Sequence, residues 1–270
     1  MNHLKRYGTI IFLCLIASAC SRTKSIDPQT YVHATISDID SLDPAWSYDT
    51  ASHSIILNIY EPLVDYDGGS ISELIPKIAS IVPSIKNGLI TNKGKTYTFP
   101  IRKGVKFHLG NEVTPEDVRY SLMRFMLFDR SSGPSPLVLE PVIGLPSTRE
   151  NGVPLDVAYA KADKAVQIKG NKVVLTLDKP FPPILTILAQ WAPILSKSWC
   201  MANGEWDGTK ETWKKHNNPK QTDSYLNDHA NGTGPFMLER WDKKNKEVVL
   251  ARFDGYWREP AKLKRALFKG

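Results

Sequence analysis

Residues 96–108 read TYTFPIRKGVKFH, and residues 114–118 read TPEDV. Between residues 95 and 101 apolar and polar side chains alternate, which predicts a half-buried β-strand. Gly104 permits a tight turn after this strand. The run 105–108 then predicts a second strand, so the stretch indicates two strands joined by a turn and followed closely by another element.

That next element is the best-defined helix of the sequence. Thr114 is a typical N-cap, Pro115 suits the first helical position, and Asp117 completes a capping-box pattern. Glu116 and Asp117 also place negative charge at the positive end of the helix dipole. Apolar residues then recur at helical spacing and form one face, made of Val118, Leu122, Phe125 and Met126.

Further elements are predicted on both sides of this region. Residues 129–152 hold several Gly, Pro and Ser residues and predict a loop. A Gly-Asn pair between two alternating runs predicts a β-hairpin of 165–169 and 173–177. The other predicted elements are strands over 31–36, 63–66, 234–238 and 247–253, and helices over 52–60 and 181–191. Strands and helices mix without regular alternation, which predicts an α/β fold with a mixed sheet.

The first nineteen residues have the layout of an export signal. Lys5 and Arg6 precede an apolar run at 10–16, and the small residues 17–19 follow it, as in a secretory signal peptide. The run is too short to cross a membrane, which takes ~20 apolar residues. The alternative interpretation, a buried N-terminal helix, does not account for the flanking charges and the cleavage-site pattern.

Residues 15–20, LIASAC, resemble a bacterial lipobox, in which the cysteine receives diacylglycerol and becomes the new N-terminus. Ala17 stands where leucine is usual. The resemblance implies that Cys20 is lipidated and that residues 20–29 form a short polar tether to the membrane. Cleavage by ordinary signal peptidase, leaving a soluble protein with a free Cys20, is the alternative.

Composition excludes several classes of protein. The formal net charge of +7 falls to +5 once Lys5 and Arg6 are removed, and the isoelectric point is near 9.2. The basic residues are interleaved with acids along the chain, without the basic stripe that nucleic-acid binding requires. The densest cluster, at 243–246, lies between two alternating runs and predicts a hairpin turn. With 41% hydrophobic residues, the chain is expected to fold.

Patterns of catalytic or metal-binding residues are missing from the sequence. Cys14 and Cys20 belong to the N-terminal segment, so Cys200 has no partner for an intramolecular disulfide and is predicted to be a small buried hydrophobe. A phosphate-binding loop ending at residue 96 would need glycine in place of Leu89. Neither a zinc-binding HExxH helix nor a GxSxG nucleophile elbow occurs. No cofactor, no metal and no enzymatic activity are therefore predicted.

The quoted stretches, together with GTGPF at 232–236 and DGYW at 254–257, resemble the signature of the extracellular solute-binding proteins of family 5, which serve peptide and nickel ABC transporters. SLDP at 41–44 and YEPL at 60–63 fit the same pattern nearer the start. The resemblance extends from residue 31 to the end of the chain. Most of these motif residues have an evident role in turns, caps and strands, so they are expected to build the scaffold.

The resemblance implies a class II periplasmic-binding-protein-like fold, with two lobes that close on a solute. Since family members are about twice as long, residues 30–270 are expected to form the N-terminal lobe, with the second lobe missing. This lobe is expected to contain a mixed sheet and a smaller α/β subdomain inserted at roughly 55–175.

The function that the resemblance implies is that of the substrate-binding component of an ABC transporter that imports oligopeptides or dipeptides. Its partners would be a peptide or similar solute, the permease and ATPase, and a bacterial membrane in the periplasm or at the cell surface. The residues predicted to face the ligand lie in two loops and are Ser37, Asp38, Asp40, Gly232 and Gly234. A purely structural role for both loops is the alternative.

A second function of a different class also fits the sequence. The chain would then be a surface lipoprotein without a transport role, or the product of a decayed or split gene with no ligand binding of its own.

Overall fold

The computed structural model describes residues 27–270, so the predicted signal peptide and Cys20 lie outside the described residues. The main sheet has the strand order β1–β12–β11–β10. Strand β1 is parallel to β12, whereas β12–β11 and β11–β10 are antiparallel, which confirms the prediction of a mixed sheet. These strands are β1 (Thr30–Ala34), β10 (Phe236–Asp242), β11 (Glu247–Arg252) and β12 (Arg265–Lys269).

A second, antiparallel sheet has the strand order β4–β5–β9–β8. Its strands are β4 (Ile90–Thr91), β5 (Thr96–Pro100), β8 (Val166–Ile168) and β9 (Lys172–Thr176). Two small ribbons complete the strands, β2 (Val64–Tyr66) with β3 (Leu74–Pro76), and β6 (Arg149–Glu150) with β7 (Val153–Pro154). The predicted hairpin of 165–169 and 173–177 is thus confirmed as β8 and β9, while the subdomain bounds of 55 and 175 stay a prediction.

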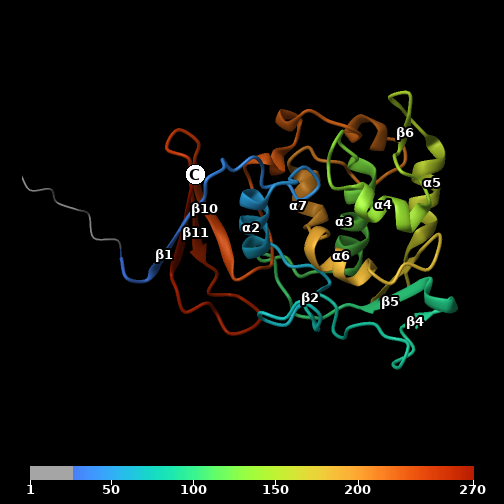
Figure 1. Cartoon of the computed structure of the whole chain (residues 1–270), viewed down its shortest axis with the longest axis horizontal. Coiled ribbons are helices and arrows are strands. Elements are labelled where there is room, and N and C mark those ends of the chain that lie inside the picture. The colour runs from blue at the N-terminus through green and yellow to red at the C-terminus, as the bar shows by residue number, and fades with distance from the viewer. Residues whose placement is uncertain (1–26) are drawn as a thin grey trace, which may run out of the picture.

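The helices separate the two sheets (Figure 1). Helix α2 lies beside the main sheet, and the larger group of helices lies beyond it around α3. The helices are α2 (Thr50–Ile59), α3 (Pro115–Phe128), α4 (Pro136–Ile143), α5 (Asp156–Ala165), α6 (Ile184–Trp191) and α7 (Lys197–Ala202). Short 3-10 turns are η1 (Asn92–Gly94), η2 (Trp213–His216), η3 (Gln221–Asp223) and η4 (Tyr225–Asn227).

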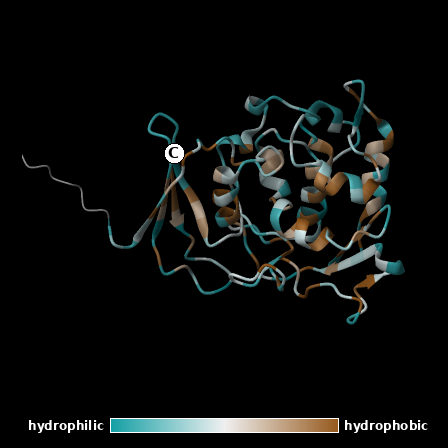
Figure 2. Cartoon of the chain, in the orientation of Figure 1, coloured by the Kyte–Doolittle hydropathy of each residue, from teal (hydrophilic) through white to brown (hydrophobic). Residues whose placement is uncertain are grey.

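Helix α3 begins as the sequence predicts. The Thr114 hydroxyl accepts from the Asp117 amide, and the Asp117 carboxylate accepts from the Thr114 amide at 2.9 Å. The other Asp117 oxygen accepts from the Lys197 amide at 2.8 Å, which attaches α7 to the start of α3. Because α3 is buried almost all round, it forms the centre of the core rather than an amphipathic cover. Hydrophobic residues accordingly gather in the central helices, whereas the β10–β11 turn is hydrophilic (Figure 2).

Two predictions from the sequence are wrong. Residues 105–108 form no strand beyond a single bridge between Lys106 and Glu112, because the chain turns back at once: the Gly110 amide donates to the Phe107 carbonyl. The predicted loop 129–152 contains α4, which begins with Pro136 at its first turn, where proline lacks no needed hydrogen bond. Helices α5 and α7 and strand β12 were not predicted.

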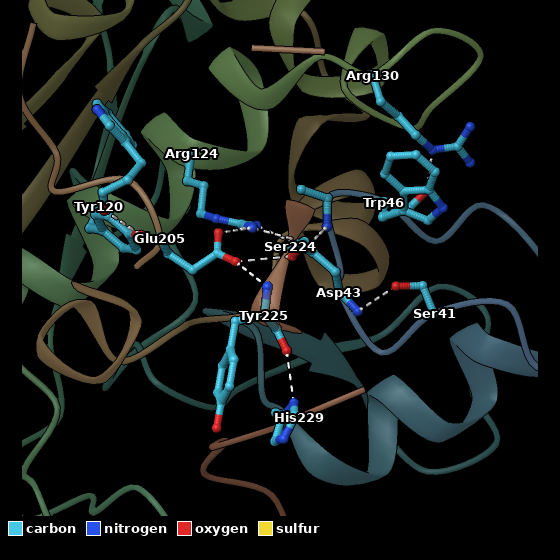
Figure 3. Close-up of polar contacts among 12 residues, drawn as sticks. Ser41, Asp43, Trp46, Tyr120, Arg124, Arg130, Glu205, Ser224, Tyr225 and His229 are labelled. Carbon is cyan, nitrogen blue, oxygen red and sulfur yellow. Dashed lines mark hydrogen bonds and ion pairs between the residues drawn. The ribbon is translucent and has the colours of Figure 1, made fainter. Parts of the chain in front are cut away.

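A buried ionic cluster holds three distant segments against α3 (Figure 3). Arg124 of α3 binds both oxygens of Asp43 at 2.8 and 2.7 Å, and the same guanidinium binds Glu205 at 2.7 Å. All three side chains are almost fully shielded from water. Ser224 lies 2.6 Å from Asp43 and 3.1 Å from Glu205, and the Tyr225 amide donates to Glu205 at 2.7 Å.

The charges in this cluster depend on one another. Burial alone would raise the pKa of Asp43, but the charge of Arg124 and hydrogen bonds from Arg124, Ser224 and the Ala45 amide hold that pKa below its usual value. Burial would likewise lower the pKa of Arg124, which the two carboxylates raise well above its usual value. The guanidinium therefore favours the ionised form of Asp43 against the effect of burial.

Replacing Arg124 by methionine tests this account. Arg124→Met leaves two buried carboxylates without a counter-charge, so the free energy of unfolding should fall by about 3–5 kcal/mol. The control is Arg265→Met, which breaks the exposed ion pair with Glu239 and should cost at most about 1 kcal/mol. Urea denaturation measures both, and equal losses in the two variants would contradict the assigned role.

Candidate functional site

The predicted ligand loop 37–40 joins β1 to the segment before α2. The backbone amides of Asp40 and Ser41 donate to the Ser52 hydroxyl of α2, at 2.8 and 3.3 Å. Ser52 is buried in the first turn of the helix. The loop is therefore held at the N-terminal end of α2, beside the carboxyl end of β1.

Asp38 and Asp40 both have partners from distant segments. Lys246, in the β10–β11 turn, donates to Asp38 at 2.7 and 2.9 Å. Asp40 accepts from Gln221 at 3.0 Å and from the Trp46 indole at 3.3 Å. The two acids help to line an open cavity of about 400 Å³ that also includes Gln221 and Lys246.

On the other side of the same loop lies a second depression, of about 330 Å³, which we call the β1–α2 groove. Residues 33–37 form one wall, and Thr50, Ala51 and Ser54 of α2 form the other. Strand β1 is the edge strand of the main sheet, so one side of its backbone is unpaired in the described structure. Thr35, Ser37, Thr50 and Ser54 bring hydroxyl groups to the lining, which also includes the apolar residues Ala34, Ile36 and Ala51.

Gly232 and Gly234 lie against the opposite end of α2. A Cβ atom on Gly232 would come within 1.9 Å of the Ile59 carbonyl oxygen, and one on Gly234 within 2.5 Å of the Asn58 carbonyl oxygen. Ser52 and Ile59 are seven residues apart on α2, which is about 10 Å along the axis. The structure thus separates the two predicted loops, and it gives these glycines a packing role that needs the absence of a side chain.

The motif residues meet around a second buried acid, Glu61. Its carboxylate accepts from the Tyr256 hydroxyl at 2.6 Å and from the Trp257 indole at 2.7 Å. The Thr233 hydroxyl lies 3.1 Å from the same carboxylate. Burial first, and then the charge of Glu61, raise the pKa of Tyr256 well above its usual value, so the phenol stays protonated as a donor. Residues 60–63, 232–236 and 254–257 therefore form one structural junction.

Arg102 belongs to the same junction. Its guanidinium lies 4.5 Å from the centre of the Trp257 ring and donates to the Lys77 carbonyl at 2.9 Å. Arg258 also lies 4.5 Å from this ring centre. The expectation that the motif residues build the scaffold is supported by these contacts, although neither buried acid was recognised as a charge centre in the sequence.

His108 holds the Gly232–Gly234 turn from outside. Its Nδ1 accepts from the Gly232 amide at 3.2 Å, and its Nε2 donates to the Gly234 carbonyl at 3.0 Å. This arrangement requires the neutral ring with its proton on Nε2. Burial lowers the pKa of His108 to about 4, against the opposing effect of the Gly234 hydrogen bond.

Within residues 27–270, no group of three or more His, Cys, Asp or Glu side chains is placed to hold a metal ion. Cys200 is buried, and burial raises its pKa to about 12, so it stays a thiol. No helix among these residues is both long and apolar enough to cross a membrane.

The neutral state of His108 predicts acid destabilisation. In the unfolded chain the imidazole takes up a proton near pH 6.5, whereas the folded ring resists protonation down to about pH 4. The stability that the neutral ring contributes above pH 6.5 is therefore lost as the pH falls towards 4, by up to about 3 kcal/mol.

The measurement compares the free energy of unfolding of wild type and His108→Gln between pH 4 and 7.5. The difference between them should be largest near neutral pH and should shrink on acidification. His229→Gln, at an exposed histidine, is the control. A difference that does not change with pH would show that His108 protonation plays no part.

Comparisons with known proteins agree with the arrangement of motifs. The chain is 29% identical over 266 residues to a dipeptide-binding protein of Escherichia coli, covering 94% of this chain and 43% of that protein. It is 28% identical over 228 residues to the oligopeptide-binding protein OppA of Bacillus subtilis, covering 83% of this chain and 36% of the relative.

Solved structures show the same fold. The Listeria monocytogenes OppA bound to peptide superposes with a TM-score of 0.65 at 19% identity, over 89% of this chain and 42% of the other. The murein tripeptide binding protein MppA of Escherichia coli gives a TM-score of 0.64 at 21% identity, over 89% and 41%. These likenesses confirm the predicted class II periplasmic-binding-protein fold of a single lobe.

The chain thus spans about two fifths of the length of the relatives it matches. The model of the bacterial extracellular solute-binding proteins, family 5 (middle region), matches residues 81–269. This range covers the second sheet, the helices from α3 to α7, and the main sheet except for β1. It contains Arg124 and Glu205 of the buried ionic cluster, but neither Asp43 nor Glu61. The chain therefore belongs to family 5 of the bacterial extracellular solute-binding proteins.

Proposed function

We propose that this chain forms the N-terminal lobe of the substrate-binding component of an ABC transporter that imports peptides. The observation that carries the proposal is the β1–α2 groove, which lies between the end of an edge strand and the first turns of α2 and is lined in part by Ser and Thr residues. Family membership and relatives described as dipeptide-, glutathione- and oligopeptide-binding proteins support the choice of peptides as ligands.

The groove suits the backbone of an extended peptide. An edge strand presents free N–H and C=O groups in a row, and an added peptide strand can pair with them. Such pairing reads the backbone and not the side chains, so it accepts many sequences. The start of α2 faces the same groove through Thr50 and Ala51, where the helix dipole favours a carbonyl oxygen or a carboxylate.

The charged loop beside the groove has a different role in this proposal. Asp38 and Asp40 are engaged by Lys246 and Gln221, so they fix the position of the loop and turn it towards the ligand. We infer that Ser37 adjoins the bound peptide and that Asp40 acts by holding the loop in place, while Gly232 and Gly234 act only through the packing of α2. The permease and ATPase of the transporter would be the partners of the loaded protein.

Binding of peptides by the natural full-length protein tests this function. Isothermal titration with di-, tri- and tetrapeptides should show saturable binding. Asp40→Ala should weaken the affinity about tenfold or more, because the loop loses two of its hydrogen bonds. Asp254→Ala, which removes an exposed partner of Arg252, is the matched control and should bind as wild type does.

Lack of binding to every peptide would refute the transport function and favour a surface lipoprotein without a transport role, or a non-functional product. An unchanged peptide affinity in Asp40→Ala would show that Asp40 does not contribute to binding, and it would leave the proposed function standing.

We also propose that Cys20 is lipidated and attaches the protein to a bacterial membrane, in the periplasm or at the cell surface. The sequence LIASAC supports this proposal. Mass spectrometry of the mature protein should find a diacylglyceryl group on its first residue, Cys20. In Cys20→Ser the protein should leave the membrane fraction, and a free, unmodified Cys20 in the wild type would refute lipidation.

A further inference from the structure

Three aromatic rings, two from around the start of α2 and one from the end of α6, pack together and are partly exposed. Tyr48 precedes the helix, His53 lies in it, and Trp191 is the last residue of α6. The His53 and Trp191 ring centres are 4.5 Å apart with an interplanar angle of 30°, and the Tyr48 ring stands against Trp191 at 5.1 Å and 65°. Tyr48 is 49% exposed, and the other two side chains are half-buried.

The rings adjoin the β1–α2 groove through His53, which is a neighbour of Thr50 on α2. Thr50, His53 and Ser54 share one helical face, because residues three and four apart are neighbours at about 5–6 Å between Cβ atoms. Thr50 and Ser54 line the groove, and His53 is their neighbour on the helix surface without lining the groove itself. In an extended peptide every second side chain faces the same way at a spacing of about 7 Å. A peptide in the groove can therefore reach the rings with a side chain.

The side chain that contacts the His53 ring by a hydrogen bond is a neutral amide. The His53 Nε2 lies 3.4 Å from the Gln190 amide oxygen, which orients the imidazole. Burial lowers the pKa of His53, so the ring is neutral at pH 7. Asp49 is the acid whose charge acts on His53, but its oxygens cap α2 by accepting from the Ser52 amide at 2.8 Å and the Ser47 hydroxyl at 3.3 Å.

We propose that Tyr48, His53 and Trp191 form a stacking platform for one aromatic side chain of the bound peptide. The platform rests on the proposed function, since it is a subsite of the peptide groove. Aromatic rings in contact prefer offset or edge-on arrangements, and one such contact is worth roughly a two- to tenfold gain in affinity. Backbone pairing in the groove accepts any sequence, and the platform adds a preference at one position of the peptide.

The test measures selectivity in the natural full-length protein by isothermal titration. The probes are tri-alanine, the three tripeptides in which one alanine is replaced by phenylalanine, and the three in which one alanine is replaced by arginine. Wild type should prefer phenylalanine over alanine about two- to tenfold at one position only. In Trp191→Leu the ratio of the two affinities should fall towards one. Tyr48→Ala should reduce the same ratio, and its exposed position makes misfolding no concern.

Trp199→Leu is the matched control, because this half-buried tryptophan of α7 packs against Tyr225, away from the groove. A phenylalanine preference that survives in Trp191→Leu and Tyr48→Ala would overturn the platform, as would a stronger preference for arginine. If either variant bound tri-alanine and the phenylalanine peptide more weakly by the same factor, the platform would also be overturned. The rings would then support peptide binding in general and would not contact the phenylalanine side chain. Peptide binding by wild type without any phenylalanine preference refutes the platform alone, whereas no peptide binding refutes the proposed function.

Discussion

The buried guanidinium of Arg124 is the interaction on which the arrangement of this lobe depends. Asp43 and Glu205 come from segments far from α3 in sequence, and the guanidinium supplies the counter-charge that both buried carboxylates contact. By binding Asp43, Arg124 fixes the segment that leads into α2, and with it one wall of the groove. By binding Glu205, it also holds the 3-10 turns that contact Asp40. Arg124 thus connects helix α3, at the centre of the core, to the segments beside the β1–α2 groove.

Glu61 provides a second buried junction, and the two together separate scaffold from site. Residues of the family motifs make the contacts in both junctions. Asp43 belongs to the first, and Glu61, Thr233 and Trp257 belong to the second. The β1–α2 groove and the aromatic platform are made of residues outside the motifs. A scaffold that is fixed by buried charges can carry a surface that varies, which suits a family whose members bind different solutes.

Local signals in the sequence predicted much of the fold. The capping box at Thr114, the Gly-Asn hairpin and the alternation around Phe99 each depend on neighbours in the chain, and each is confirmed. Helix α4 was missed because the Gly, Pro and Ser residues around it, Pro136 included, are typical of loops, although Pro136 stands at a position that tolerates it. The pairing of Arg124 with Asp43 joins residues 81 apart, and the platform joins Tyr48 to Trp191, so no local pattern could predict either. The resemblance could suggest the loop 37–40 as a ligand loop. That this loop and Gly232 lie at opposite ends of α2 could be seen only in the structure.

The central claim is that peptide contacts the β1–α2 groove while the motif residues only support it. Hydrogen–deuterium exchange of the full-length protein, with and without a saturating peptide, tests this claim most directly. The account predicts slower exchange of the backbone amides at 33–37 and 50–54, with no change at the already packed amides of 232–234. Protection at 232–234 without protection in the groove would contradict it.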